Sequence, residues 1–155
     1  MTPGIEPARK AKVSHKVHEY SHDSSSDSYG LEAAEKLGVP PGQVFKTLVV
    51  SLAKRELAVG VVPVSSMLSM KQIARAAGAK KAVMATPEEV ERSTGYVLGG
   101  VSPPGQKKKL RTFIDASAED HTTIFVSAGR RGLEIELDPT DLAQLLQGRF
   151  AQLCQ

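Results

Sequence analysis

The sequence predicts a single α/β domain in which helices surround a mixed β-sheet. The chain has 155 residues, the length of one typical domain. Hydrophobic residues make up 41% and charged residues 24% of the chain, which is the balance of a folded globular protein. Strand-like segments follow one another across short turns and also follow helical segments. This order favours a sheet that contains both antiparallel and parallel neighbours.

The first half of the chain is expected to alternate between helices and strands. Thr2 and Pro3 are suited to open a first helix. Gly4 and Pro7 weaken the turn that follows. The next expected elements are a strand over 13–20, a helix that Gly38 ends, and strands over 44–52 and 57–64 joined as a hairpin.

Capping residues mark the helices of the second half. Ser69 precedes a helix that Gly78 ends. Thr86 opens the capping box of the next helix, and Gly95 lies just past it. Asp138 caps the final helix. Short strands are expected over 82–84, 96–98, 112–114, 122–127 and 133–137.

Composition excludes several classes of protein. The single Cys154 excludes an internal disulfide and a multi-cysteine zinc site, and its position predicts that it lies on a terminal tail. The four histidines form no H-E-x-x-H motif and are expected to be solvated. No phosphate-binding loop, dinucleotide fingerprint, secretory signal or run of roughly 20 apolar residues is present. We therefore expect a cytoplasmic protein that needs no metal, cofactor or membrane.

Lys46 is the most informative single residue. It lies between Phe45 and Thr47 in a strand whose other residues are largely apolar. A strand with apolar residues on both faces is central in a sheet, and a lysine there has to reach a cleft or a partner. The alternative is a lysine that extends to solvent from the start of the strand. The pattern by itself leaves both interpretations open.

Two glycine-containing loops are further candidates. The loop 99–105 begins with Gly99 and Gly100, whose backbone can approach a ligand closely and present N–H groups to an anion. The turn 127–132 places Arg130 and Arg131 between glycines. At each loop the alternative is an ordinary tight turn with solvated side chains.

Positive charge is gathered in clusters rather than spread evenly. Lysine and arginine number 20 against 17 acidic residues, a net charge of +3. The clusters are Arg9, Lys10, Lys12 and Lys16; Lys80 and Lys81; Lys107, Lys108 and Lys109 with Arg111; and Arg130 with Arg131. Such clusters suit a polyanionic partner held through its phosphates. A solvated fringe of basic side chains is the alternative.

Three motifs occur together in a fixed order. They are VFKTLVV at 44–50, GYVLGGVSPPGQKK at 95–108 and SAGRRGLEIEL at 127–137. Together they resemble the YbaK-type aminoacyl-tRNA deacylases, which are free-standing relatives of the editing domain of bacterial prolyl-tRNA synthetases. The likeness extends to TPGIEPARKAKVSHKVHEY and YGLEAAEKLGV in the N-terminal part. It implies one domain over residues 1–155, with a partly barrel-like mixed sheet wrapped by helices.

The resemblance also implies site residues. The essential lysine of the family corresponds to Lys46, its conserved tyrosine to Tyr20, and its acidic position to Glu134, where some members carry aspartate. Its glycine loop corresponds to Gly99, Gly100, Ser102 and Pro103, and the two glycines are expected to act in catalysis with Lys46. The residues expected to contact substrate are Tyr20, Phe45, Thr47, Ser102, Pro103 and Glu134. Those expected to contact tRNA phosphates are Lys107, Lys108, Lys109, Arg130 and Arg131.

The function implied by the resemblance is removal of a wrong amino acid from tRNA, most typically cysteine from proline tRNA and also from cysteine tRNA. The expected partners are the acceptor end of aminoacyl-tRNA and prolyl-tRNA synthetase. Because the chain offers no framed nucleophile, the substrate's own thiol is expected to attack the ester, as in a lyase or hydrolase reaction. Two alternatives stay open: an alanyl-tRNA(Pro) deacylase that uses water, and a non-catalytic module that binds tRNA or a synthetase.

Overall fold

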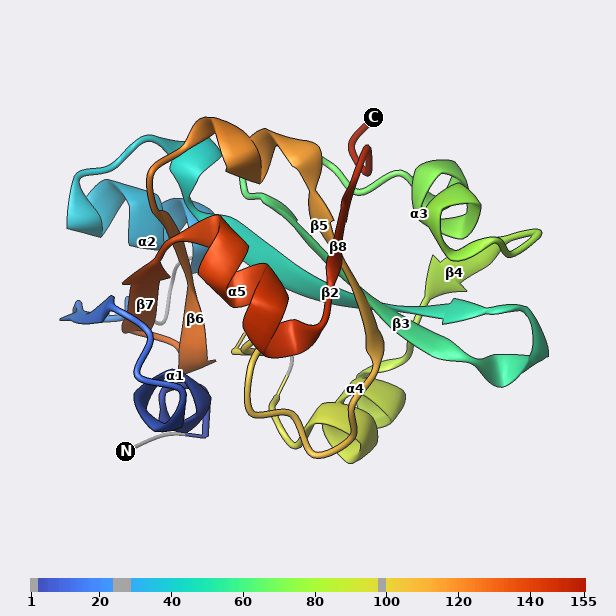
Figure 1. Ribbon diagram of the computed structural model, residues 1–155, viewed down its shortest axis with the longest axis horizontal. Helices are drawn as coiled ribbons and strands as arrows, with labels where there is room; N and C mark the ends of the chain where they lie inside the picture. Colours follow the sequence, from blue (N-terminus) through green and yellow to red (C-terminus); the bar gives the residue numbers. More distant parts are fainter. Residues whose placement is uncertain (1–2, 24–28, 98–99) are drawn as a thin grey trace.

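A computed structural model describes residues 3–23, 29–97 and 100–155 (Figure 1). The helices are α1 (Glu6–Lys10), α2 (Tyr29–Leu37), α3 (Met70–Ala77), α4 (Pro87–Thr94) and α5 (Pro139–Leu146). The strands are β1 (His15–Glu19), β2 (Phe45–Leu52), β3 (Leu57–Pro63), β4 (Ala82–Met84), β5 (Arg111–Asp115), β6 (Ile124–Arg130), β7 (Leu133–Leu137) and β8 (Arg149–Ala151). Short 3-10 turns lie at Pro41–Gln43, Ala53–Arg55 and Ala116–Asp120.

The strands form two sheets. The larger has the order β4-β2-β3-β5-β8 and the smaller the order β1-β7-β6. β2 and β3 form an antiparallel hairpin, whereas β3, β5 and β8 are parallel, so the predicted mixed sheet is confirmed. A bridge between Val44, which directly precedes β2, and Phe125 of β6 links the two sheets. The two sheets therefore meet at a corner without closing into a barrel.

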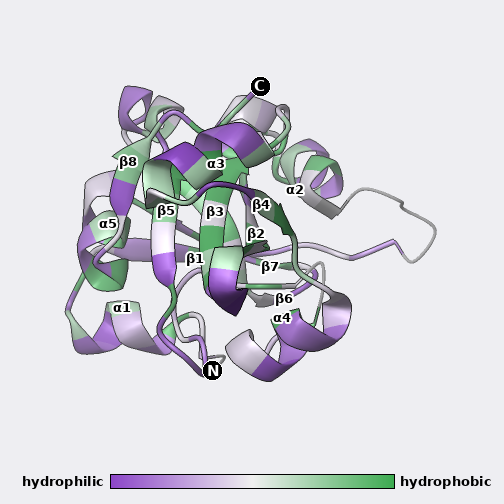
Figure 2. Cartoon of the chain, turned by 90° about the vertical axis from the view of Figure 1, so that its right-hand side faces the viewer, coloured by the Kyte–Doolittle hydropathy of each residue, from purple (hydrophilic) through white to green (hydrophobic). Residues whose placement is uncertain are grey.

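The main core lies between the two sheets and α5. Its buried side chains include Phe45, Ile114, Ile124, Ile135 and Leu142. Figure 2 shows the apolar strands β2 and β3 inside a largely polar outer surface. β3 is buried over almost its whole length, as expected for a strand with neighbours on both sides.

A second cluster packs α3 against the other side of the larger sheet. Ile73 of α3 meets Val62 and Phe113 there. A Cβ atom at Gly60 would lie 3.0 Å from Cδ1 of Ile73, so glycine allows the helix to approach the strand closely.

The predicted helix caps are confirmed. The Ser69 side chain accepts a hydrogen bond from the N–H of Gln72, and Asp138 caps α5 through the N–H of Thr140. Thr86 and Glu89 form the reciprocal hydrogen bonds of a capping box. These bonds satisfy backbone donors that a helix start leaves without partners.

Two predicted elements differ from the structure. Tyr96 and Val97 are not a strand, and Leu98 lies outside the described residues. The chain turns there instead, because the Tyr96 hydroxyl donates to the Pro104 carbonyl at 2.9 Å and holds the loop back on itself. The first helix begins at Glu6 rather than next to Pro3.

The C-terminal segment is folded, and the expectation of a terminal tail at Cys154 is wrong. β8 was not predicted, and Leu153 beyond it is fully buried. The N–H of Leu153 donates to the Asp115 carboxylate at 2.9 Å, while its carbonyl accepts from the Ser69 N–H at 2.7 Å. Cys154 itself is half-buried in a bridge opposite Leu68. Among the described helices, none is long and apolar enough to cross a membrane.

Candidate active site

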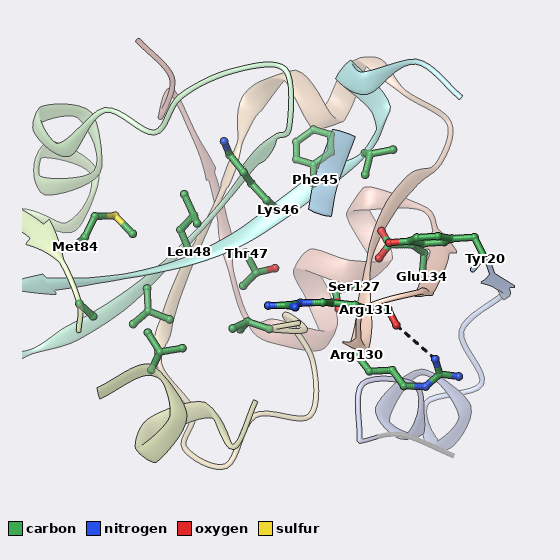
Figure 3. Close-up of a pocket in the computed structure, with 16 residues that line it drawn as sticks. Tyr20, Phe45, Lys46, Thr47, Leu48, Met84, Ser127, Arg130, Arg131 and Glu134 are labelled. Atoms are coloured by element: carbon green, nitrogen blue, oxygen red, sulfur yellow. Dashed lines mark hydrogen bonds between the residues drawn. The ribbon is translucent and has the colours of Figure 1, made fainter. Parts of the chain in front are cut away.

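A cavity of about 370 Å³ opens between β2 and the β6–β7 hairpin (Figure 3). Most of its walls come from three parts of the chain that are distant in sequence: β2, the hairpin, and the segment from β4 into α4. Tyr20, Gly30 and Val101 add to them from other segments. The lining residues are Tyr20, Gly30, Val44, Phe45, Lys46, Thr47, Leu48, Val49, Met84, Ala85, Val90, Val101, Ser127, Arg130, Arg131 and Glu134. The cavity thus contains residues of all three sequence motifs, with Val101 as the one contribution of the second.

β2 supplies a cation and a hydroxyl to the cavity. The backbone of Lys46 is paired with Val62 and that of Thr47 with Val61, so both are held by the hairpin with β3. The Lys46 ammonium has no ion-pair or hydrogen-bond partner in the described part of the chain. The Thr47 Oγ1 atom is buried and also has no hydrogen-bond partner there. A buried hydroxyl without a partner is costly, which points to a polar ligand at this wall.

Glu134 and Tyr20 form the opposite end of the cavity, and their side chains lie beside each other in Figure 3. Glu134 is only 6% exposed, and this burial raises the pKa of its carboxyl to about 8. Burial and then the Glu134 charge raise the pKa of Tyr20 to about 12. Both side chains are therefore mostly uncharged at neutral pH. Glu134 can then donate a hydrogen bond as well as accept one.

The net charge of the cavity is positive at neutral pH. Lys46, Arg130 and Arg131 are its cations, and Figure 3 shows the Arg131 guanidinium directed toward Thr47. Arg130 donates from Nη1 to the Arg131 carbonyl at 3.5 Å, which draws the turn together. A cationic cavity with apolar walls suits a small group attached to an anion.

The glycine loop lies beside the cavity. Gly99 is outside the described residues. The N–H of Gly100 donates to the Val97 carbonyl at 3.0 Å, and a Cβ atom there would lie 3.4 Å from Cα of Arg130. Gly100 therefore packs on the β6–β7 turn with its own N–H engaged.

Ser102 and Pro103 are buried outside the cavity lining. The Ser102 carbonyl accepts a hydrogen bond from Gln106 at 3.1 Å, within the loop itself. Pro103 lines a second, separate depression of about 210 Å³. These two residues of the loop are therefore packed inside the protein and do not form part of the cavity wall.

The five residues predicted to contact phosphates fall into two groups. Arg130 and Arg131 line the cavity. Lys107, Lys108 and Lys109 are exposed, and the last two border the second depression. The N–H groups of Lys107 and Lys108 donate to carbonyls at the end of α4, both at 2.9 Å. The lysine run is thus fixed to α4, away from the cavity walls.

The histidines are hydrogen-bonded rather than solvated where the structure gives contacts. His18 Nε2 lies 2.9 Å from Glu136 Oε1, and His22 Nδ1 lies 2.6 Å from Glu32 Oε1. No group of three or more potential metal ligands occurs among the described residues.

Comparison with known proteins identifies the fold and the family. Residues 26–145 match the family model of the aminoacyl-tRNA editing domain. The chain belongs to this family. A relative from Enterococcus faecalis, named "Putative Cys-tRNA(Pro)/Cys-tRNA(Cys) deacylase EbsC", is 38% identical over 98% of this chain and 92% of its own length. The uncharacterized protein YwhH of Bacillus subtilis is 30% identical over 73% of this chain and 71% of its own length.

Solved structures have the same fold. The crystal structure of "a putative trans-editing enzyme for prolyl tRNA synthetase" matches with a TM-score of 0.84 at 25% identity, covering 100% of this chain and 99% of that one. The hypothetical protein APE2540 matches with a TM-score of 0.88 at 22% identity over 99% of both chains, which bears on the fold alone. The resemblance seen in the sequence motifs is therefore confirmed.

Sequence analysis missed the apolar side of the editing-domain cavity. Met84 comes from β4, Ala85 from the link to α4, Val90 from α4, and Val101 from the loop that follows. The one local signal is that Val83 and Met84 are both large apolar residues in a short edge strand, where they are 54% and 47% exposed. Such a short run does not distinguish a cavity wall from ordinary surface.

Proposed function

We propose that this editing domain is a cytoplasmic trans-editing deacylase that removes cysteine from mischarged proline tRNA, and also from cysteine tRNA. The family and the name of the Enterococcus relative support this class of activity. The observation that carries the proposal is the Lys46 ammonium, which borders the cavity with no counter-ion among the described residues. A cation in such a position binds a phosphate or stabilises a developing negative charge.

The aminoacyl end would lie with its side chain among the apolar walls and its ribose toward Lys46. Phe45 and Met84 give an apolar boundary for a small side chain. Uncharged Glu134 and Tyr20 offer hydrogen bonds to the polar atoms of the amino acid. Arg130 and Arg131 would meet the phosphate that precedes the terminal ribose.

The proposed reaction is an attack by the substrate on itself. The cysteine Sγ, as thiolate, attacks the ester carbonyl carbon, and the bond from that carbon to the ribose oxygen breaks. The products are a four-membered cyclic thioester and tRNA with a free hydroxyl, whose proton replaces the one lost by the thiol. The Thr47 hydroxyl and Lys46 would stabilise the developing oxyanion and the leaving oxygen, since the N–H of Gly100 is already engaged.

Water-based deacylation of an alanyl ester is less well supported by the cavity. Its described lining contains no histidine, and Glu134 holds its proton through most of the neutral range. A mostly protonated carboxyl is a poor general base at pH 7. A thiol is partly ionised at that pH and needs only to be held near the carbonyl.

A panel of charged tRNAs tests the proposed function. The protein is incubated with cysteinyl-, alanyl- and prolyl-tRNA(Pro) and with cysteinyl-tRNA(Cys), and the remaining ester is measured over time. We expect the cysteinyl esters to be cleared and prolyl-tRNA(Pro) to persist. Binding of all four without acceleration of any ester loss would contradict the proposal and favour a non-catalytic tRNA-binding module. Preferential loss of the alanyl ester would identify the water-using deacylase instead.

A further inference from the structure

A second basic region lies on α3 and β4, outside the cavity. Lys71 and Arg75 of α3, with Lys80 and Lys81 before β4, border a depression of about 430 Å³, and these four residues are called the α3–β4 basic surface. The other described residues of its lining are Met70, Ala74, Ala79 and Ala82, so no described residue of the lining is acidic.

The four cations are unneutralised in the described chain. Each is exposed, and none forms an ion pair or side-chain hydrogen bond with a described residue. Lys71 and Arg75 are four residues apart on one helix, so they face the same side and repel each other. A bound polyanion would relieve this repulsion.

β4 connects this surface directly to the cavity. Ala82 lines the basic depression and Met84 lines the cavity wall, two residues further along the same strand. A strand advances about 3.3 Å per residue, so the two linings are roughly 7 Å apart along it. Figures 1 and 2 show β4 directly below α3 at the edge of the larger sheet, with the hydrophilic face of α3 turned outward.

We propose that the α3–β4 basic surface binds phosphates of the RNA strand whose aminoacylated end enters the cavity. This inference rests on the proposed function and extends it, because it gives the path of the acceptor strand over the protein. An RNA backbone fits the surface better than a protein partner does. Protein interfaces centre on aromatic and other apolar anchors and are depleted of lysine. The described lining of this surface has four cations and no aromatic residue.

Two triple variants with the same change of charge test the proposal. Lys71→Gln/Lys80→Gln/Lys81→Gln removes three cations of the surface. Lys10→Gln/Lys12→Gln/Lys16→Gln removes three exposed lysines from the end of α1, the turn after it and β1. Figure 1 shows α1 at the far end of the molecule from α3. Both variants have 17 basic and 17 acidic residues, because three of the 20 basic residues are replaced. Dissociation constants for proline tRNA are measured across a salt series.

We expect the surface variant to bind tRNA at least about tenfold more weakly at low salt, with a salt slope shallower by about 2 for three lost single-strand phosphate contacts. The control variant should bind like the wild type. Equal slopes in the two variants would overturn the proposal. Unchanged tRNA binding with loss of affinity for prolyl-tRNA synthetase would also overturn it and assign the surface to a protein partner.

A small substrate separates this proposal from the proposed function. Cysteinyl adenosine carries the ester and the terminal ribose but no upstream phosphates. If the deacylase function is correct, wild type and both variants cleave it at the same rate, and the surface variant is impaired only on tRNA, through KM. If wild type cleaves neither the small ester nor cysteinyl-tRNA, the proposed function fails, while the salt slopes still report on the surface.

Discussion

Lys46 is fixed in position by the strand that carries it. The residues before and after it, Phe45 and Thr47, both pair with β3. The side chain is half-buried at the cavity wall. Its role can therefore be tested with little effect on the fold. We predict that Lys46→Ala keeps its cooperative unfolding transition, while single-turnover deacylation falls by about two or more powers of ten, as for loss of one transition-state contact. Lys16→Ala, at an exposed position of β1, is the control. An unfolded variant, or one with wild-type turnover, would make Lys46 structural.

Glu134 gives a prediction about stability and pH. Its carboxyl has an ordinary pKa near 4.5 and a folded-state pKa of about 8 because of burial. Between these values the folded protein keeps a proton that the unfolded chain has released, so stability falls as pH rises, by about 1.4 kcal/mol per pH unit from this group. Glu134→Gln removes this slope. In urea unfolding, the free energy of unfolding of the variant should therefore rise steadily relative to that of the wild type from pH 5 to pH 8.

Glu136, two residues away, is the matched control with the opposite sign. Burial pushes the pKa of Glu136 upward, but hydrogen bonds from Thr123 and His18 outweigh burial and lower it overall. Its stabilising effect is present above the ordinary carboxyl pKa and is lost only as pH falls below it. Glu136→Gln should thus be less stable than wild type throughout pH 5 to pH 8, without the gain with rising pH expected of Glu134→Gln. Parallel curves for Glu134→Gln and wild type would show that Glu134 is ionised in the folded protein.

At the scale of elements, the helices could be predicted well and the C-terminal segment could not. The starts of α3, α4 and α5 depend on capping residues within a few positions of each helix, so the sequence contains their cause locally. β8 has three residues, and its register comes from pairing with β5, as Phe113 opposite Arg149. That contact joins residues far apart in sequence, and no local pattern indicates it.

In the candidate site, too, some residues could be predicted from a local pattern and others could not. Lys46 could be found because a charge inside an apolar strand is unusual at the local level. The partnership of β2 with Glu134 and with Met84 depends on how two sheets and an edge strand meet, which only the fold determines. Ser102 and Pro103 are predicted from the motif to contact substrate, yet both are buried outside the cavity lining. A motif indicates which residues occur together with a site. It does not indicate whether each of them reaches the cavity, because that depends on how the loop packs.

The loop that carries Lys107, Lys108 and Lys109 is held in place by backbone hydrogen bonds to the end of α4. We propose that these exposed side chains meet the acceptor stem. Replacing all three with glutamine should flatten the salt dependence of tRNA binding by about 0.7 to 0.9 per lost contact. The Lys10→Gln/Lys12→Gln/Lys16→Gln variant serves as the control here as well. A salt slope equal to that of the control would remove this loop from the RNA interface.

The C-terminal segment contacts both Asp115 at the end of β5 and Ser69 at the start of α3 through Leu153. This places Cys154 close enough to Lys46 for an electrostatic interaction. Burial and then Asp115 raise the pKa of the Cys154 thiol to about 11, so it is un-ionised at neutral pH and a poor nucleophile. We predict that Cys154→Ala deacylates cysteinyl-tRNA at the wild-type rate, with a stability loss of about 1 kcal/mol from the lost packing. A rate reduced at unchanged stability would mean that Cys154 takes part in the reaction.

The whole molecule presents a small cationic cavity in which the described residues include no nucleophile paired with a base, so the side chain of the substrate should decide the rate. Single-turnover decay of cysteinyl, seryl and alanyl esters on one proline tRNA body measures this directly. The three side chains are close in size but differ in the nucleophile they carry, and only the thiol is partly ionised near neutral pH. We predict that the cysteinyl ester decays much faster than the seryl ester and that the alanyl ester is slowest. Equal rates for the alanyl and cysteinyl esters would contradict attack by the substrate thiol.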